Sequence, residues 1–189
     1  MDNGASSYRR FLSGDETAFV EIVDEYRESL IFFLYRYVGD LTAAEDLAED
    51  VFVEVLLHPK RFHFQCALKT WLFTIGRNKA VDYIRKSSRL ALAPSAELAD
   101  LQDAALQADL RSLEEDVLDS EEKRALNRAL REIKEEYRLA LHLVYFEELS
   151  HEEAGRIMGK NRKQVENLVS RGRQSLRKIL QKEGFGLEE

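Results

Sequence analysis

Apolar residues recur at intervals of three and four through the first part of the chain. The run goes from Phe19 to Tyr37, with members at Ile22, Val23, Tyr26, Leu30, Phe33 and Leu34. This spacing gathers them on one face of a helix. The pattern predicts a long amphipathic helix that ends at Gly39 and Asp40.

A second helix is predicted directly after it. Thr42 and Glu45 have the spacing of a capping box, in which each side chain accepts a hydrogen bond from the other residue's backbone N–H. We expect this helix to run to about Leu57, because Pro59 cannot continue it. A third helix follows a loop at residues 61–67.

Composition then divides the chain into three parts. Residues 1–87 hold the three helices, and residues 121–189 form a second helical segment. Between them, residues 88–120 sustain no large apolar face, and residues 88–122 carry ten acidic and two basic side chains. Like charge resists compaction. We expect an all-α protein of two small helical domains joined by a flexible acidic linker.

The C-terminal domain has the local signals of a helix-turn-helix. Ser150 and Glu153 form a capping box before a short helix, and Gly159 stands where a left-handed residue would end it. Asn161 can then cap a second helix, from Arg162 to about residue 180.

The second helix separates apolar from polar side chains. Its apolar stripe is Val165, Leu168, Val169, Gly172 and Leu176, opposite or beside Lys163, Gln164, Asn167, Ser170, Arg171 and Gln174. Such polar donors can read base edges in a major groove, and Arg162, Arg173, Arg177 and Lys178 can neutralise phosphates. The alternative is a solvated basic helix without a ligand.

The charge distribution favours DNA binding despite a net charge of −7 over 189 residues. Residues 69–87 carry five basic and one acidic side chain, and residues 156–182 carry nine and one. A phosphate backbone responds to local charge, so the acidic total does not exclude nucleic acid.

Other classes fit poorly. The single cysteine, Cys66, and four scattered histidines make no closed metal site, so we expect no metal, no cofactor and no enzymatic activity. We expect no leader and no membrane span, because the first residues lack a basic, apolar, small-residue pattern and the longest apolar run, Leu30 to Tyr35, is too short to cross a bilayer. We expect a cytoplasmic protein without direct membrane association.

Three stretches resemble the extracytoplasmic-function subgroup of the sigma-70 family. Residues 44–52 read AEDLAEDVF, residues 70–78 read TWLFTIGRN and precede Asp82, Tyr83 and Arg85, and residues 145–150 read YFEELS before the helix-turn-helix. This chain departs from the family's usual pattern at three places. Glu49 stands where the family usually has Gln, Ile133-Lys134 replaces a common Leu-Pro, and Lys160 replaces a branched apolar residue.

The resemblance implies a sigma factor that binds core RNA polymerase and promoter DNA and is sequestered by an anti-sigma factor. Residues 1–87 would bind core and the minus-10 element, and residues 121–189 the minus-35 element. The implied core-binding residues are Glu45, Asp46, Leu47, Glu49, Asp50, Phe52 and Val53. Those for minus-10 DNA are Phe62, Phe64, Lys69, Trp71, Arg77, Asn78, Asp82 and Arg85, and those for minus-35 DNA are Arg162, Lys163, Gln164, Asn167, Ser170, Arg171, Arg173 and Lys178.

The residues themselves support the first two sets. Like charges lie one helical turn apart in two pairs, Glu45 with Glu49 and Asp46 with Asp50. Their repulsion weakens the helix, and a basic partner surface would relieve it and gain affinity. Residues 61–85 supply aromatic side chains among cations, as a surface that holds unstacked bases requires.

Two other functions stay open at this point. A one-component helix-turn-helix regulator would need a dimer interface and an inducer pocket, and would not need both the acidic and the aromatic-basic helix. An adaptor that binds only protein would not need the basic C-terminal helix.

Overall fold

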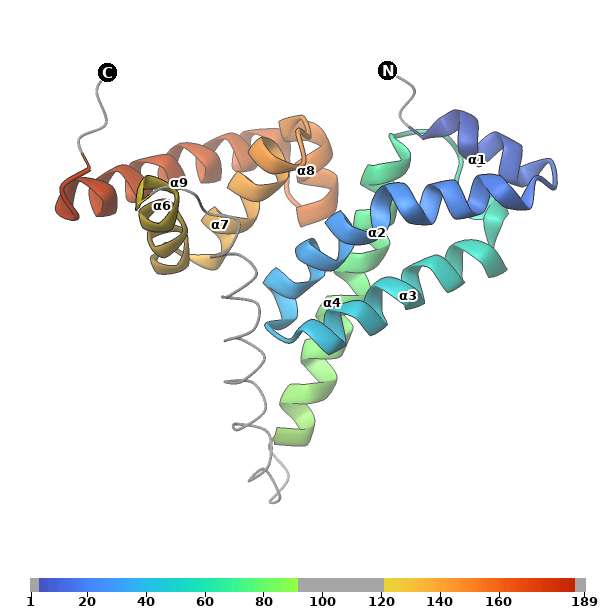
Figure 1. The fold of residues 1–189 in the computed structure, drawn as a ribbon, viewed down its shortest axis with the longest axis horizontal. Helices are drawn as coiled ribbons and strands as arrows, with labels where there is room; N and C mark the ends of the chain where they lie inside the picture. Colours follow the sequence, from blue (N-terminus) through green and yellow to red (C-terminus); the bar gives the residue numbers. More distant parts are fainter. Residues whose placement is uncertain (1–3, 92–120, 186–189) are drawn as a thin grey trace. The chain divides into compact units, whose positions relative to one another are not determined.

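The computed structural model describes residues 4–91 and 121–185, and these residues form helices without a β-strand among them (Figure 1). The predicted all-α fold is therefore confirmed. Contacts divide the chain into two compact units, residues 1–106 and 107–189. The proposed linker lies outside the described residues from residue 92 onward, so its flexibility stays a prediction.

The first unit is built around one central helix. Its helices are α1 (Ala5–Leu12), α2 (Glu16–Val38), α3 (Leu41–Leu57) and α4 (Leu68–Ala91), with a short 3-10 turn at Pro59–Arg61. Helix α2 packs against α1, α3 and α4 (Figure 1). Its predicted apolar stripe is the reason, because Ile22, Leu30, Phe33 and Leu34 are fully buried. Burial of each such side chain stabilises the fold by about 1.5 to 3 kcal/mol.

The ends of α2 and α3 test the capping predictions. Gly39 takes a left-handed conformation, φ 74°, and ends α2 as expected. The predicted cap at Thr42 is wrong, because α3 begins at Leu41 and Asp40 caps it. The Asp40 carboxylate accepts a hydrogen bond from the Ala43 N–H at 2.6 Å. Asp40 both follows the helix-ending glycine and supplies the stronger acceptor for the next helix.

Helix α1 was not predicted from the sequence, although it is packed into the first unit. Tyr8 is fully buried, and its hydroxyl donates to the carbonyl of Pro59 at 2.8 Å. This bond ties the N-terminal helix to the segment that joins α3 to α4. Burial raises the pKa of Tyr8 to about 12.

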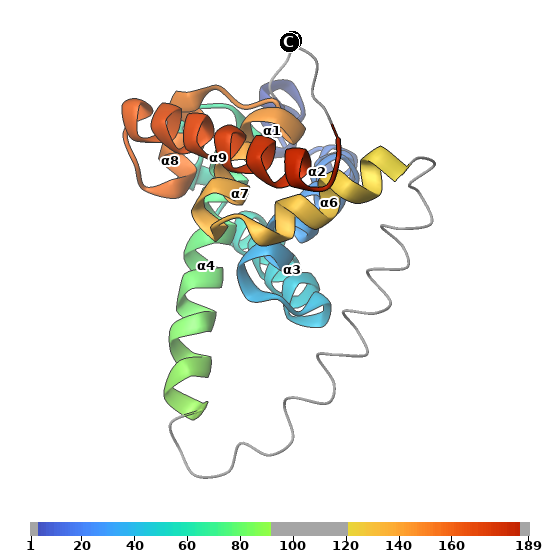
Figure 2. The same cartoon turned by 90° about the vertical axis from the view of Figure 1, so that its left-hand side faces the viewer.

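The second unit holds the helix-turn-helix. Its elements are α6 (Glu121–Glu132), α7 (Glu135–Leu141), a π-helical turn (His142–Phe146), α8 (His151–Met158) and α9 (Arg162–Lys182). Helix α9 contacts α6, α7 and α8, as Figures 1 and 2 show. Near its C-terminal end, Leu180 packs with Ala125 and Ala129 of α6. This support fixes the long helix along much of its length.

Candidate nucleic-acid interface

The helix-turn-helix has the caps that the sequence predicts. The Ser150 hydroxyl accepts from the Glu153 N–H at 3.2 Å, and the Glu153 carboxylate accepts from the Ser150 N–H at 3.0 Å. Gly159 has φ 65° and ends α8. Asn161 and Gln164 form a second capping box, with distances of 2.9 and 2.8 Å, which begins α9 at Arg162.

The turn between α8 and α9 depends on close backbone contact. The Lys160 N–H donates to the Gly155 carbonyl at 2.8 Å, and a Cβ on Gly155 would lie 2.6 Å from the Lys160 carbonyl oxygen. The turn therefore requires glycine at position 155, because a side chain there would collide with the backbone of Lys160. Lys160 is accommodated because its ammonium reaches the carboxylate of Glu136 on α7 at 2.9 Å.

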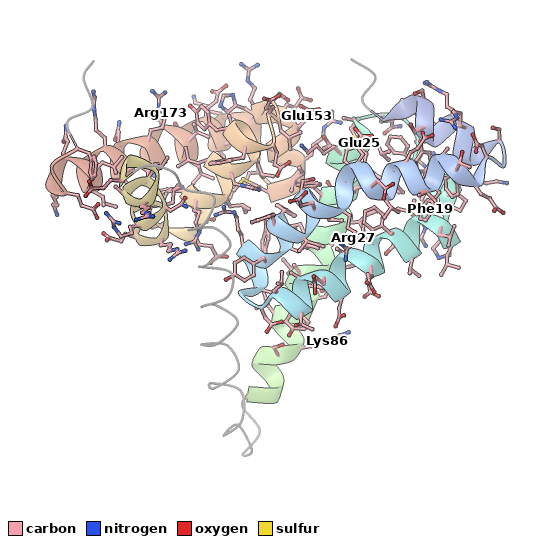
Figure 3. The ribbon with its side chains drawn as sticks, in the orientation of Figure 1. Phe19, Glu25, Arg27, Lys86, Glu153 and Arg173 are labelled. Carbon is pink, nitrogen blue, oxygen red and sulfur yellow. The ribbon has the colours of Figure 1, made fainter. Side chains whose placement is uncertain are left out.

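Helix α9 buries its apolar stripe and leaves its polar face exposed. Val165, Val169 and Gly172 are buried, and Leu168 and Leu176 are half-buried. The predicted DNA-contacting side chains are all exposed: Arg162, Lys163, Gln164, Asn167, Ser170, Arg171, Arg173 and Lys178. Arg173 lies on the outer surface of α9 in Figure 3. The orientation of this helix thus presents its donors to solvent.

Two members of this set already have partners on α9. The guanidinium of Arg162 donates to the carboxylate of Glu166 at 2.8 Å, one turn further along. Gln164 uses its carbonyl oxygen in the capping box. Lys163, Asn167 and Arg171 lie on the same exposed face and belong to neither the ion pair nor the capping box, which makes them better suited to contact bases.

The acidic face of α3 contains both exposed and buried members of the predicted core-binding set. Asp46, Glu49, Asp50 and Val53 are exposed, and Glu45 is half-buried. Leu47 and Phe52 are 8% and 6% exposed and belong to the core of the first unit. Their burial orients α3, while the exposed residues are the ones that can contact a partner.

Glu54 of α3 differs from the exposed carboxylates, because it pairs with cations of the same unit. Glu54 accepts a hydrogen bond from Arg61 at 3.0 Å and forms an ion pair with Lys79 of α4 at 3.2 Å. Glu54 therefore links α3 to both segments that flank residues 62–67, the aromatic loop that carries Phe62 and Phe64. It is not available as part of the acidic face in the way that Asp46 and Asp50 are.

The two phenylalanines of the loop have different environments. Phe62 is 4% exposed, and its ring lies 4.9 Å from that of Tyr8 and 5.1 Å from that of Trp71. Phe64 is 37% exposed and has φ 57°, a left-handed conformation that is rare for a bulky side chain. Phe62 thus supports the loop from within, and only Phe64 presents its ring to solvent.

The remaining predicted minus-10 residues lie along α4. Asn78, Asp82 and Arg85 are exposed, while Lys69, Trp71 and Arg77 are half-buried. Asp82 and Arg85 form an ion pair with each other at 3.6 Å. The ammonium nitrogen of Lys69 lies 5.7 Å from the centroid of the Phe73 ring. Lys86, labelled in Figure 3, adds an exposed cation beyond Arg85 on the same helix.

Sequence reasoning also missed a buried polar pair in the second unit. His142 and Glu147 lie at the two ends of the π-helical turn, with His142 Nε2 3.1 Å from a carboxylate oxygen of Glu147. Both side chains are nearly inaccessible. The turn brings residues five apart together, a spacing that an α-helical pattern does not reveal.

Within residues 4–91 and 121–185, no three His, Cys, Asp or Glu side chains form a group that would hold a metal ion. No helix in those ranges has the length and apolarity needed to cross a membrane.

The fold and the exposed basic face of the helix-turn-helix define a DNA-binding protein of two helical units. Residues 22–90 match the family model of sigma-70 region 2, and residues 123–176 match that of sigma-70 region 4. The chain is 30% identical to the ECF RNA polymerase sigma factor SigW of Bacillus subtilis (strain 168) over 171 residues, 88% of this chain and 91% of that protein.

Further similarities agree with this match. SigM, another ECF RNA polymerase sigma factor of Bacillus subtilis (strain 168), is 28% identical over 84% of this chain and 93% of its own length. The fold is similar to that of the sigma factor RpoE from Bartonella quintana, with a TM-score of 0.63 and 23% identity over 86% of this chain and 96% of that one. The chain belongs to the extracytoplasmic-function subgroup of the sigma-70 family. Members of this class are transcription initiation factors that direct core RNA polymerase to promoters.

Proposed function

We propose that the two units of this sigma factor divide promoter recognition between them. Residues 1–87 bind core polymerase and open the minus-10 element, and residues 121–189 bind the minus-35 element. The observation that supports this division most is the burial pattern of α9, whose apolar stripe is packed inside while its donors are exposed. A merely solvated basic helix would not need two capping boxes and a glycine turn to fix its orientation.

The core-binding contact is proposed for the exposed part of the α3 face. Asp46, Glu49 and Asp50 supply negative charge, and Val53, 51% exposed, supplies an apolar contact beside it. A basic surface on the polymerase would relieve the repulsion between these carboxylates. Leu47 and Phe52 act only through the orientation of the helix.

The minus-10 contact is proposed for the aromatic loop and the exposed face of α4. An unstacked base stacks on the ring of Phe64, while Asn78, Lys86 and Arg85 lie where the strand continues along α4. Aromatic stacking of this kind contributes about 1 to 3 kcal/mol per base. Trp71, half-buried against Phe62, mainly holds the loop in position.

Partners and compartment follow from the same assignment. The structure of RpoE from Bartonella quintana was solved in complex with the anti-sigma factor NepR, and that of CnrH with the cytosolic domain of CnrY. We infer that an anti-sigma factor likewise sequesters this chain, and that it acts in the cytoplasm, where bacterial promoters and polymerase meet. A one-component regulator is not favoured, because the similarity covers both units.

The central experiment is transcription of genomic DNA by core polymerase with and without the protein, with the 5′ ends of the transcripts mapped. Protein-dependent ends at a shared upstream sequence support the proposal. The matched variant is Asp46→Arg with Asp50→Arg, which should abolish association with core while the fold persists. Its control, Glu121→Arg with Glu132→Arg, makes the same charge change at exposed residues of α6. Core binding that survives the first change refutes the α3 assignment.

The α9 assignment is tested on the promoter that this experiment identifies. Asn167→Ala should cost about 1 to 3 kcal/mol and relax preference at one base pair. Lys178→Ala should weaken all sequences alike and lower the salt dependence of binding. If both variants weaken every single-base promoter variant equally, α9 binds only phosphates.

A further inference from the structure

Helix α1 forms one wall of the aromatic loop. Tyr8 is fully buried, and its ring meets those of Phe62, Phe64 and Trp71 edge-on, with centroids at 4.9, 6.0 and 5.9 Å. The next residue, Arg9, lies with its guanidinium carbon 4.9 Å from the centroid of the Phe64 ring. The N-terminal helix therefore reaches the exposed aromatic side chain of this loop directly.

The two arginines of α1 differ in what holds them. The guanidinium of Arg10 binds Asp15 at 2.6 Å and Glu21 at 2.8 Å, so its charge is neutralised within the protein. The hydrogen bonds that the guanidinium donates to these acids, chiefly the one to Asp15, raise the pKa of Arg10. Arg9 is exposed, and its contact among the described residues is the Phe64 ring, a neutral partner. The positive charge of Arg9 can therefore bind an anion.

We propose that Arg9 is a further DNA-contacting residue, which binds a phosphate of the opened promoter strand beside the base that stacks on Phe64. The proposal rests on the minus-10 role proposed above for Phe64. A guanidinium stacked over an aromatic ring keeps its N–H donors at its edge, where they can meet a phosphate. A base on the ring brings its own phosphates within reach of a cation placed 4.9 Å from the ring centroid.

The test uses holoenzyme and a fluorescent single strand that carries the minus-10 sequence found by transcript mapping. Binding is measured at several salt concentrations for Arg9→Ala, Arg9→Lys, Arg10→Ala and Phe64→Ala. Arg9→Ala should weaken binding about 5- to 10-fold and reduce the salt slope by about 0.7, the value for one phosphate contact on a single strand. Arg9→Lys should keep the slope, and Arg10→Ala should leave both affinity and slope unchanged.

Several outcomes overturn the proposal. Arg9→Ala that binds like the native protein excludes the contact, and weaker binding with an unchanged slope shows that Arg9 only supports Phe64. If Phe64→Ala loses binding and Arg9→Ala binds normally, only the assignment of Arg9 is overturned. If both variants bind normally, the role of Phe64 is overturned as well. Binding of the upstream duplex element, measured in parallel, should be the same for all four variants, since it reports on the other unit.

Discussion

The helix-turn-helix and the aromatic loop are fixed by interactions of different range. In the helix-turn-helix, the determining bonds join residues three to five apart, as between Ser150 and Glu153 or Gly155 and Lys160. In the loop, the hydroxyl of Tyr8 bonds the carbonyl of Pro59, 51 residues away in sequence. One proposed DNA-binding surface is therefore specified mainly by local bonds, and the other depends on tertiary packing.

This difference suits what each surface is proposed to do. A helix that reads duplex DNA needs one rigid orientation, which local caps and a glycine turn supply. A loop that receives an unstacked base holds Phe64 in a left-handed conformation, which costs about 1 to 3 kcal/mol and persists only when the surroundings stabilise it. In this protein Tyr8, Phe62 and Trp71 are those surroundings.

The largest expected effect comes from removing the long-range support. Tyr8→Ala should lower the free energy of unfolding of the first unit by about 3 to 5 kcal/mol, because it leaves a cavity where a fully buried aromatic ring stood. Trp71 is the single tryptophan, so its fluorescence follows this unit alone. Tyr8→Phe is the control and should cost about 1 kcal/mol, the value of one hydrogen bond. An unchanged tryptophan transition in Tyr8→Ala would show that α1 is dispensable to the loop.

A smaller effect is expected from breaking the local turn. Gly155→Ala should destabilise the second unit by about 2 to 3 kcal/mol, because the new Cβ meets a backbone oxygen that cannot move without opening the turn. Circular dichroism should show part of the helical signal melting earlier, while the Trp71 transition stays in place. Gly172→Ala is the matched control. Its Cβ would lie 3.0 Å from a terminal carbon of Leu141 and 3.2 Å from Tyr137 Cβ, both longer than the 2.6 Å at Gly155, so its cost should be smaller. Equal costs would argue that helix packing, not the turn, requires Gly155.

The same contrast explains how far the sequence predicts the molecule. The long helices and the helix-turn-helix were predicted from periodicity and caps, because both depend on neighbours in the chain. Helix α1 was missed, since Tyr8, Phe11 and Leu12 give too short an apolar pattern to stand out without the core that they pack against. The cap of α3 was assigned to Thr42 from its spacing to Glu45, whereas the extended backbone of Asp40, φ −123° and ψ 126°, places that residue at the cap.

For the candidate site, the sequence indicates which side chains have suitable chemistry better than it indicates which of them are exposed. Phe62 and Phe64 are equivalent in the sequence, yet one is buried and the other exposed. Phe62 packs between Tyr8 and Trp71, and no local pattern connects Tyr8 to the loop. Likewise, the periodicity of α3 does not by itself show that Glu54 is held by Arg61 and Lys79. Residues on the polar face of α9 were predicted as exposed because a helix with one clear apolar stripe leaves no ambiguity.

The smallest expected effect is a pH dependence confined to the Tyr8 contact. Burial raises the pKa of Tyr8 to about 12, whereas an unfolded tyrosine titrates near 10. Between these values the unfolded chain releases the proton and the folded chain keeps it, so stability is fully present below about pH 10 and is lost as pH rises toward 12. Native protein should lose about 1 kcal/mol relative to Tyr8→Phe by about pH 11. Urea unfolding followed by circular dichroism, with both proteins at each pH, measures this difference, and all other tyrosines and lysines cancel in it. If the two stabilities fall in parallel, Tyr8 titrates like an exposed residue, and the aromatic wall built by α1 is open to water.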